Sequence, residues 1–317
     1  GTILKNQGNL IEAKNIIETS IKLNPKSADS FNTLGSILID QGEIDLAKES
    51  IEKAISLNPK LAEAFNNMAL IYQETNQIDD AYKSLLKAIN LDPEFFDAFL
   101  NLGKIFKIQD KSEEAKEATL KAIQINPNSP LAHSNLSNIF HNLNEPELAK
   151  TSALKALELK PDFAEAYVNL SNALIDLGRY KEAKENILKA ISLKDENNNS
   201  YTNLGHICNS QENYEDAKKY LKKAIELKAD NNSAHHNLAI TLLKSKQFVE
   251  GWKEYEWRWK AKNRKFNIGD KLKTDKPEWS PDQRGRVLLW SEQGLGDELM
   301  FASLIPDFID YVDQLII

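Results

Sequence analysis

Residues 28–61 read ADSFNTLGSILIDQGEIDLAKESIEKAISLNPKL, and residues 62–95 repeat the pattern as AEAFNNMALIYQETNQIDDAYKSLLKAINLDPEF. Small residues fall at matching places in both stretches, and a proline stands two residues before each end. A fixed period of this length indicates one supersecondary unit copied along the chain. The fold is therefore expected to be a stack of such units.

The same register extends far beyond these two stretches. Prolines recur every 34 residues at Pro25, Pro59, Pro93, Pro127 and Pro161. Two columns of alanine run through the chain, at Ala47, Ala81, Ala115, Ala149, Ala183 and Ala217, and at Ala54, Ala88, Ala122, Ala156, Ala190 and Ala224. Small residues let two helices approach closely, and a proline ends the second helix because it cannot continue one. Each repeat is therefore predicted to be a pair of packed helices.

This pattern resembles the tetratricopeptide-repeat family, whose repeats have 34 residues. The resemblance implies an all-α fold, a right-handed α-α superhelix. Residues 1–27 are then a partial repeat, residues 28–231 six full repeats, and residues 232–265 a modified seventh repeat with an aromatic capping helix. Because the repeat is already under way at Gly1, we expect the chain to be a fragment.

One polar column precedes the large apolar residue of each first helix. It consists of Asn67, Asn101, Asn135, Asn169, Asn203 and Asn237. An amide has both a donor and an acceptor, so such a row can hold the backbone of an extended peptide. The column resembles the asparagine ladder of superhelical O-linked N-acetylglucosamine transferases, which implies a concave peptide-binding groove. In the alternative interpretation, the amides only bond neighbouring helices.

The charges around this column favour one kind of partner. Acidic residues recur on the same helices at Asp29, Glu63, Asp97 and Glu165, so the N-terminal half of the groove is expected to be acidic and to prefer neutral or basic segments. In the alternative interpretation, these carboxylates are only a solvated, inert face. The position before each asparagine lacks the lysine that tetratricopeptide domains of the chaperone-binding type need. It is occupied by Asn66, Leu100, Ser134, Val168, Thr202 and His236, and the same place one repeat before Asn66 holds Asn32. The expected partner is a protein or extended peptide, with no clamp for a terminal carboxylate.

The composition of the chain bears on whether it binds nucleic acid, a membrane or a metal. The net charge of −7 and 27% charged residues are ordinary for a soluble protein, and nucleic acid is not an expected partner. No apolar run approaches the length of a membrane span. No histidine, cysteine and aspartate cluster has metal-ligand spacing, so no metal is expected. The single cysteine, Cys208, forms no internal disulfide; it is expected to be a small core residue in a protein of the cytoplasm.

The last part of the chain changes character. Residues 266–286 read as a basic linker, and residues 287–317 as strand, glycine turn, helix and strand, the opening βαβ unit of a Rossmann-like domain. Asp297 follows the glycine turn; it can bond a sugar hydroxyl or take its proton, or it can simply cap the helix. A truncated sheet exposes its edges, so a dimer through this segment is also expected.

The C-terminal part contains the motifs Gly251-Trp252, then Glu254 to Trp259, Trp279, and Leu289 to Glu298. With these motifs it resembles bacterial tetratricopeptide proteins with two-Rossmann glycosyltransferase domains, including the heptosyltransferases. The resemblance implies sugar transfer by a longer parent protein that uses a nucleotide sugar, with Asp297 on the acceptor side. Because the chain stops at the second strand, this polypeptide is expected to hold no cofactor and to be inactive alone.

Overall fold

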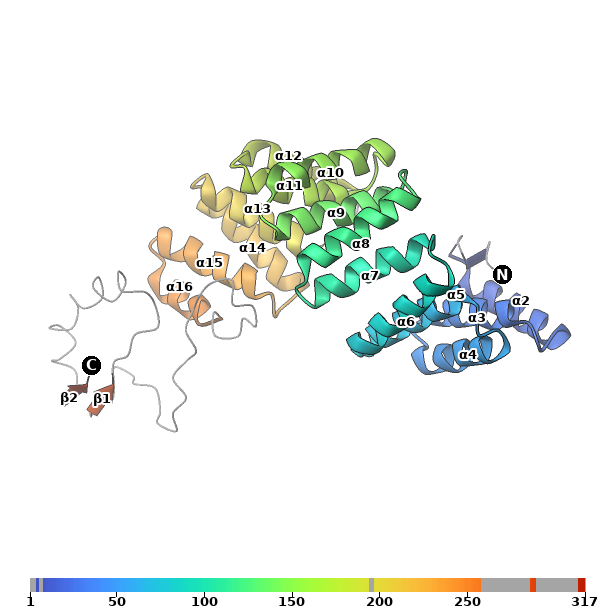
Figure 1. The fold of residues 1–317 in the computed structure, drawn as a ribbon. Coiled ribbons are helices and arrows are strands. Elements are labelled where there is room, and N and C mark those ends of the chain that lie inside the picture. The colour runs from blue at the N-terminus through green and yellow to red at the C-terminus, as the bar shows by residue number, and fades with distance from the viewer. Residues whose placement is uncertain (1–3, 6–7, 194–196, 258–285, 289–312, 317) are drawn as a thin grey trace. The chain divides into compact units, whose positions relative to one another are not determined.

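The computed structural model describes residues 4–5, 8–193, 197–257, 286–288 and 313–316. The chain divides into two compact units, unit 1 (Gly1–Glu196) and unit 2 (Asn197–Ile317). Helical hairpins make up the described part of unit 1, coloured blue to yellow-green, and residues 197–257 of unit 2, coloured yellow to orange (Figure 1). The predicted all-helical solenoid is confirmed.

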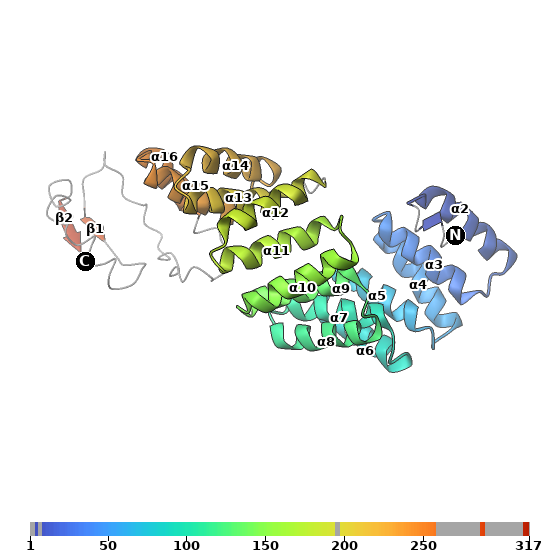
Figure 2. The same ribbon diagram turned by 90° about the horizontal axis from the view of Figure 1, so that it is seen from above.

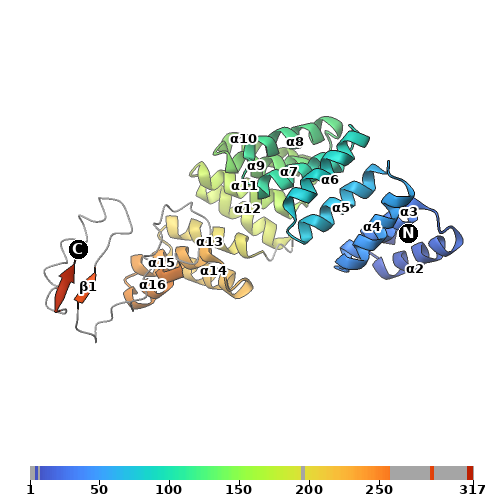
Figure 3. The same ribbon diagram turned by 60° about the horizontal axis from the view of Figure 1, so that its bottom comes forward.

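From α3 onward, each repeat has a first helix of 13 residues and then a second helix, which usually has 14 residues. Two second helices are shorter: α12 has 13 residues and α16 has 8. The helices of unit 1 are α2 (Leu10–Leu23), α3 (Ala28–Asp40), α4 (Ile44–Leu57), α5 (Ala62–Glu74), α6 (Ile78–Leu91), α7 (Phe96–Ile108), α8 (Ser112–Ile125), α9 (Pro130–Asn142), α10 (Pro146–Leu159), α11 (Ala164–Asp176) and α12 (Tyr180–Ser192). Unit 2 has α13 (Asn198–Ser210), α14 (Tyr214–Leu227), α15 (Asn232–Lys244) and α16 (Phe248–Tyr255). Each helix packs on the next within its unit, so successive hairpins stack (Figures 2 and 3).

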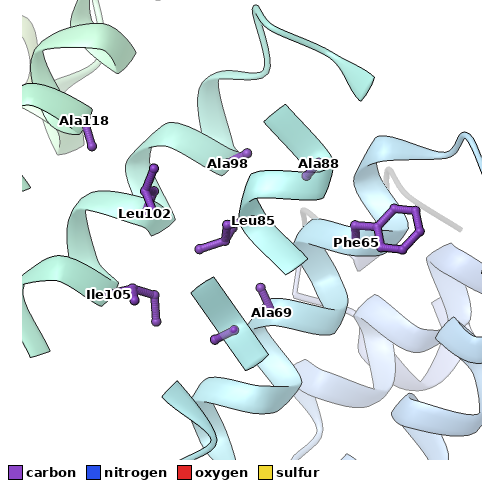
Figure 4. Packing of buried hydrophobic residues seen from close by; sticks show 9 residues of the cluster. Phe65, Ala69, Leu85, Ala88, Ala98, Leu102, Ile105 and Ala118 are labelled. Carbon is purple, nitrogen blue, oxygen red and sulfur yellow. The ribbon is translucent and has the colours of Figure 1, made fainter. Parts of the chain in front are cut away.

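The alanine columns lie where the helices meet. Ala81, Ala88 and the other alanines of the two columns are fully buried, as is Ala98. Figure 4 shows Leu85 of α6 and Leu102 of α7 among these small residues, so that one cluster joins two successive hairpins. Cys208 is also buried, as predicted, in a cluster that joins α13, α14 and α15.

The turn between the two helices of a hairpin uses a left-handed residue in every repeat. This residue is Gly42, Asn76, Asp110, Asn144, Gly178, Glu212 or Lys246, with φ between 57° and 75°. A left-handed residue is a common way to end a helix without leaving its last carbonyls unpaired. The backbone conformation is thus repeated even where the residue type is unfavourable.

Beyond α16 the structure describes only two short strands. β1 (Arg286–Leu288) and β2 (Gln314–Ile316) pair in parallel, with Val287 opposite Leu315. The predicted linker, except for Arg286, and the predicted glycine turn and helix lie outside the described residues. The βαβ unit therefore stays a prediction.

The predicted aromatic helix of the seventh repeat is α16. Its Gly251 is buried against α15, where an added Cβ would lie 2.8 Å from Leu243 Cδ2. Phe248, Val249 and Trp252 are exposed, so α16 carries an apolar surface that the described residues leave uncovered.

Candidate functional site

The first helices of unit 1 form a layer with one looser step, between α7 and α9. α3 contacts α5, α5 contacts α7, and α9 contacts α11 directly, whereas among the described residues no two successive second helices of unit 1 make contact of this extent. Helices that lie closer together occupy the inner side of a curved stack. We call the surface of α3, α5, α7, α9 and α11 the first-helix face.

Three members of the predicted asparagine column bond to the preceding repeat. Asn67 Nδ2 donates to Asn32 Oδ1 at 2.8 Å, and Asn101 Nδ2 donates to Asn66 Oδ1 at 2.9 Å. Asn169 Nδ2 donates to Ser134 Oγ at 2.9 Å and to its carbonyl oxygen at 3.1 Å. Each bond spans 35 residues, from one asparagine to the residue just before the equivalent position one repeat earlier.

Burial divides the column further. Asn101 and Asn169 are only 8% and 5% exposed, so their amides are largely shielded from any ligand. Asn67, Asn135, Asn203 and Asn237 are half-buried. For Asn101 and Asn169, the geometry fits the alternative in which the amide joins neighbouring helices. Peptide binding by the column stays a prediction.

Asn135 differs from its equivalents in unit 1. The residue one repeat earlier at the accepting position is Leu100, whose side chain has no acceptor. No hydrogen bond joins the Asn135 side chain to another part of the chain that the structure describes. Moreover, α7 and α9 are not in the close contact seen for α5 with α7 and α9 with α11. The layer is looser between these two repeats.

Ionic groups on the first-helix face are unevenly distributed. The predicted acidic residues Asp29, Glu63, Asp97 and Glu165 are all exposed. One further carboxylate, Asp176, receives a hydrogen bond from His141, with 2.6 Å between Nδ1 and Oδ2. This contact again spans 35 residues, from α9 to α11.

Two lysines on α7 interrupt this acidic surface. Lys104 and Lys107 are half-buried and lie one helical turn apart. Burial lowers the pKa of the Lys107 ammonium; the charge of Glu165 opposes this shift and that of Lys104 adds to it. Neither lysine forms a salt bridge with another described residue.

From the sequence, bonds between neighbouring helices were expected only as an alternative and without named acceptors, and the lysine pair was not predicted. The bonds between repeats could have been found by comparing the asparagine column with the column before it, where Asn32, Asn66 and Ser134 offer acceptors. The lysine pair could have been found by noting where charge appears on first helices. Neither signal was evident without knowing which columns face each other.

The catalytic candidate Asp297 lies outside the described residues, so its role stays a prediction. No group of three or more histidine, cysteine, aspartate or glutamate side chains among the described residues is placed to hold a metal ion. None of the described helices combines the length and apolar character that crossing a membrane requires.

The stacked helical hairpins and the first-helix face are typical of helical-repeat proteins, which bind other proteins on such surfaces. Models described as tetratricopeptide or TPR repeats match residues 1–27, 28–61, 50–83, 74–110, 96–129, 131–163 and 162–230. The chain belongs to the tetratricopeptide-repeat family.

Comparison with individual proteins shows the fold. FlbA of Caulobacter vibrioides is 36% identical over 74 residues, which are 23% of this chain and 12% of FlbA. A chain of the APC/C hetero-tetramer Cut9–Hcn1 superposes with a TM-score of 0.70 at 18% identity, covering 81% of this chain and 51% of that one. PilF of Pseudomonas aeruginosa superposes with a TM-score of 0.58 at 21% identity, covering 65% and 94%. The chain thus spans a small part of FlbA and about half of the Cut9–Hcn1 chain.

Proposed function

We propose that the first-helix face of unit 1 binds an extended segment of a partner protein. The observation that carries this proposal is the layer of first helices itself, which presents polar side chains at one fixed spacing. Half-buried Asn67 and Asn135 are the candidate peptide ligands in unit 1, and Asn203 and Asn237 occupy the same register in unit 2. Asn101 and Asn169 support them by fixing each repeat on the preceding one.

The charge of the face favours a partner that is neutral or basic over most of its length. The carboxylates of Asp29, Glu63 and Asp97 are exposed and repeat along α3, α5 and α7. An extended peptide lying across these helices would meet one carboxylate per repeat. Complementary charge on the peptide would raise the rate of association and select its orientation.

This proposal is tested with peptides selected from a phage-displayed library of random 12-residue sequences. Hydrogen–deuterium exchange of the chain is then measured with and without a selected peptide. We expect protection to appear in α3, α5, α7, α9 and α11. Protection confined to the second helices, or a library from which no peptide is enriched, contradicts the proposal.

A second candidate function concerns the C-terminal part. Parallel strands such as β1 and β2 need a crossover connection, and residues 289–313 separate them. This supports the proposal that residues 287–317 open a Rossmann-like domain, and that a longer parent transfers sugar from a nucleotide sugar to what the repeats bind. Asp297 would be the acceptor-side base of that parent.

The second candidate is tested with a panel of labelled nucleotide sugars. The chain alone is expected to release no nucleotide, whereas a longer protein with a second Rossmann domain is expected to transfer sugar. Turnover by the chain alone contradicts the proposal that only the longer protein is active.

Light scattering tests the proposed dimer through residues 287–317, and a fluorescent fusion tests the proposed cytoplasmic location.

A further inference from the structure

Positive charge is rare on the first helices. In unit 1, helices α3, α5, α7, α9 and α11 contain no arginine and two lysines, Lys104 and Lys107, both on α7. The same five helices contain seven acidic residues, which are Asp29, Asp40, Glu63, Glu74, Asp97, Glu165 and Asp176. The two lysines therefore form a local basic site in an acidic surface.

The partial burial of the two ammonium groups costs free energy in the protein without a ligand. Charged residues are rarely buried without a partner, because water solvates an ammonium better than the protein interior does. Lys107 is half-buried, burial lowers its pKa, and Glu165, whose charge partly offsets this shift, forms no salt bridge with it. An anion placed between Lys104 and Lys107 would offset both the desolvation and the mutual repulsion of the two ammonium groups.

The looser part of the layer lies beside this pair. Leu100 and Lys104 are four residues apart on α7, so their side chains lie on the same side of the helix. Asn135 of α9 stands opposite Leu100 by the register of the other asparagines, and its amide keeps its donors and acceptor. A peptide backbone at Asn135 would therefore place its own side chains within reach of the lysines.

We propose that Lys104, Lys107 and Asn135 form a subsite for an acidic side chain of an extended peptide. The lysines bind the Asp or Glu carboxylate, and the Asn135 amide bonds the adjacent peptide backbone. The inference rests on the proposed peptide-binding function and specifies its ligand. The anion is an internal side chain and not a chain terminus, because the position before each asparagine in unit 1 lacks a lysine.

The test uses the same random 12-residue library, fused through the peptide C-terminus to the coat protein so that no displayed peptide has a free carboxyl end. We expect the enriched peptides to share an Asp or Glu at one position. A selected peptide is then synthesised with an amidated C-terminus, and its affinity is measured by calorimetry. Replacing its shared acid by Asn or Gln is expected to weaken binding about tenfold, the loss of one charge-assisted contact.

Variants of the protein locate the contact. The double change Lys104→Glu with Lys107→Glu is expected to abolish binding of the acidic peptide, and Asn135→Ala to weaken it several-fold. The matched control is Lys53→Glu with Lys121→Glu, which changes the net charge equally on exposed second-helix positions. It should leave affinity nearly unchanged. Lys107→Met, which keeps the apolar stem, separates folding from binding: affinity should fall while the melting temperature stays or rises.

The outcomes distinguish the two proposals. Enriched peptides without a shared acid, or an affinity that the Lys104 and Lys107 changes reduce no more than the control does, overturn the subsite and leave the peptide-binding face intact. A library with no enriched peptide overturns the peptide-binding face and the subsite together.

Discussion

Gly103 of α7 shows how closely the helices of one hairpin pack. A Cβ built on Gly103 would lie 2.6 Å from Thr119 Oγ1. In the next repeat the equivalent residues are Ser137 and Ala153, and Ser137 Oγ donates to the Ala149 carbonyl at 2.8 Å. A larger first-helix residue is thus accompanied there by a smaller second-helix residue.

We therefore predict that Gly103→Ser lowers the free energy of unfolding by about 1–3 kcal/mol, because it overpacks the helix contact. Adding Thr119→Ala should restore much of this loss, since the pair then matches Ser137 and Ala153. The Thr119 hydroxyl is also buried without a hydrogen-bond partner among the described residues, so little is lost with it. Urea denaturation of the two single variants and the double variant checks this. Simple additivity of the two effects would contradict it.

The asparagine column offers a second comparison between equivalent residues. Asn101→Ala removes the donor to Asn66 Oδ1 and leaves that oxygen buried and unsatisfied, which is expected to cost about 1–3 kcal/mol of unfolding free energy. Asn135→Ala breaks no such bond and is expected to cost less than about 0.5 kcal/mol. Chemical denaturation measures both. Equal losses would show that the bonds between repeats do not stabilise the stack.

At the scale of the helix, the left-handed turn residue links the two helices of each hairpin. Glu212 adopts φ 58° where Gly178 adopts φ 72° in the preceding repeat. A side chain with a Cβ pays a steric penalty in this conformation, of about 1–2 kcal/mol. Glu212→Gly is therefore predicted to raise the free energy of unfolding by about 0.5–1 kcal/mol, after allowing for the greater freedom of glycine in the unfolded chain. Gly178→Glu is the reverse control and should lower stability; a lower melting temperature for Glu212→Gly would refute the prediction.

The end of the second helix provides another prediction. α10 ends before Lys160 and Pro161, and α14 ends before Lys228 and Ala229. The backbone of Lys160 (φ −144°, ψ 92°) and that of Lys228 (φ −148°, ψ 99°) nearly coincide, and both are extended, as a residue before proline must be. Ala229→Pro is expected to stabilise the chain by about 0.4–1 kcal/mol by restricting its unfolded state. Thermal denaturation checks this, and a loss of helix in the circular dichroism spectrum would count against it.

The positions and packing of most helices were predictable from the sequence, because small residues and prolines act locally. The alanine columns predicted which residues are buried, and Pro59 or Pro93 predicted where a second helix ends. The site was only partly predictable. The asparagine column is visible in the sequence, but whether an amide is satisfied depends on the residue facing it 35 positions earlier. Asn66 accepts a bond and Leu100 cannot, and this follows only from the way one repeat is placed on the next.

At the scale of the whole molecule, stability should be local. In a solenoid each repeat contacts only its neighbours, so stability is roughly a sum of repeat and interface contributions. The described core clusters obey this rule: one joins α2 and α3, another α3 to α5, another α5 to α8, and another α7 to α9, all within unit 1. The cluster of unit 2 draws only on α13 to α15.

Unit 1 should therefore fold without unit 2. We predict that a fragment of residues 1–193 gives a helical circular dichroism spectrum and unfolds cooperatively in urea, because the described clusters of α2 to α9 draw only on residues of unit 1. As a matched test in the full chain, Leu221→Ala should lower the stability of unit 2 by about 2–5 kcal/mol, since Leu221 is fully buried. Hydrogen exchange of α5 to α8 should be unaffected by that substitution. A fragment that lacks helical structure, or faster exchange throughout unit 1 in the Leu221 variant, would mean that the two units fold as one.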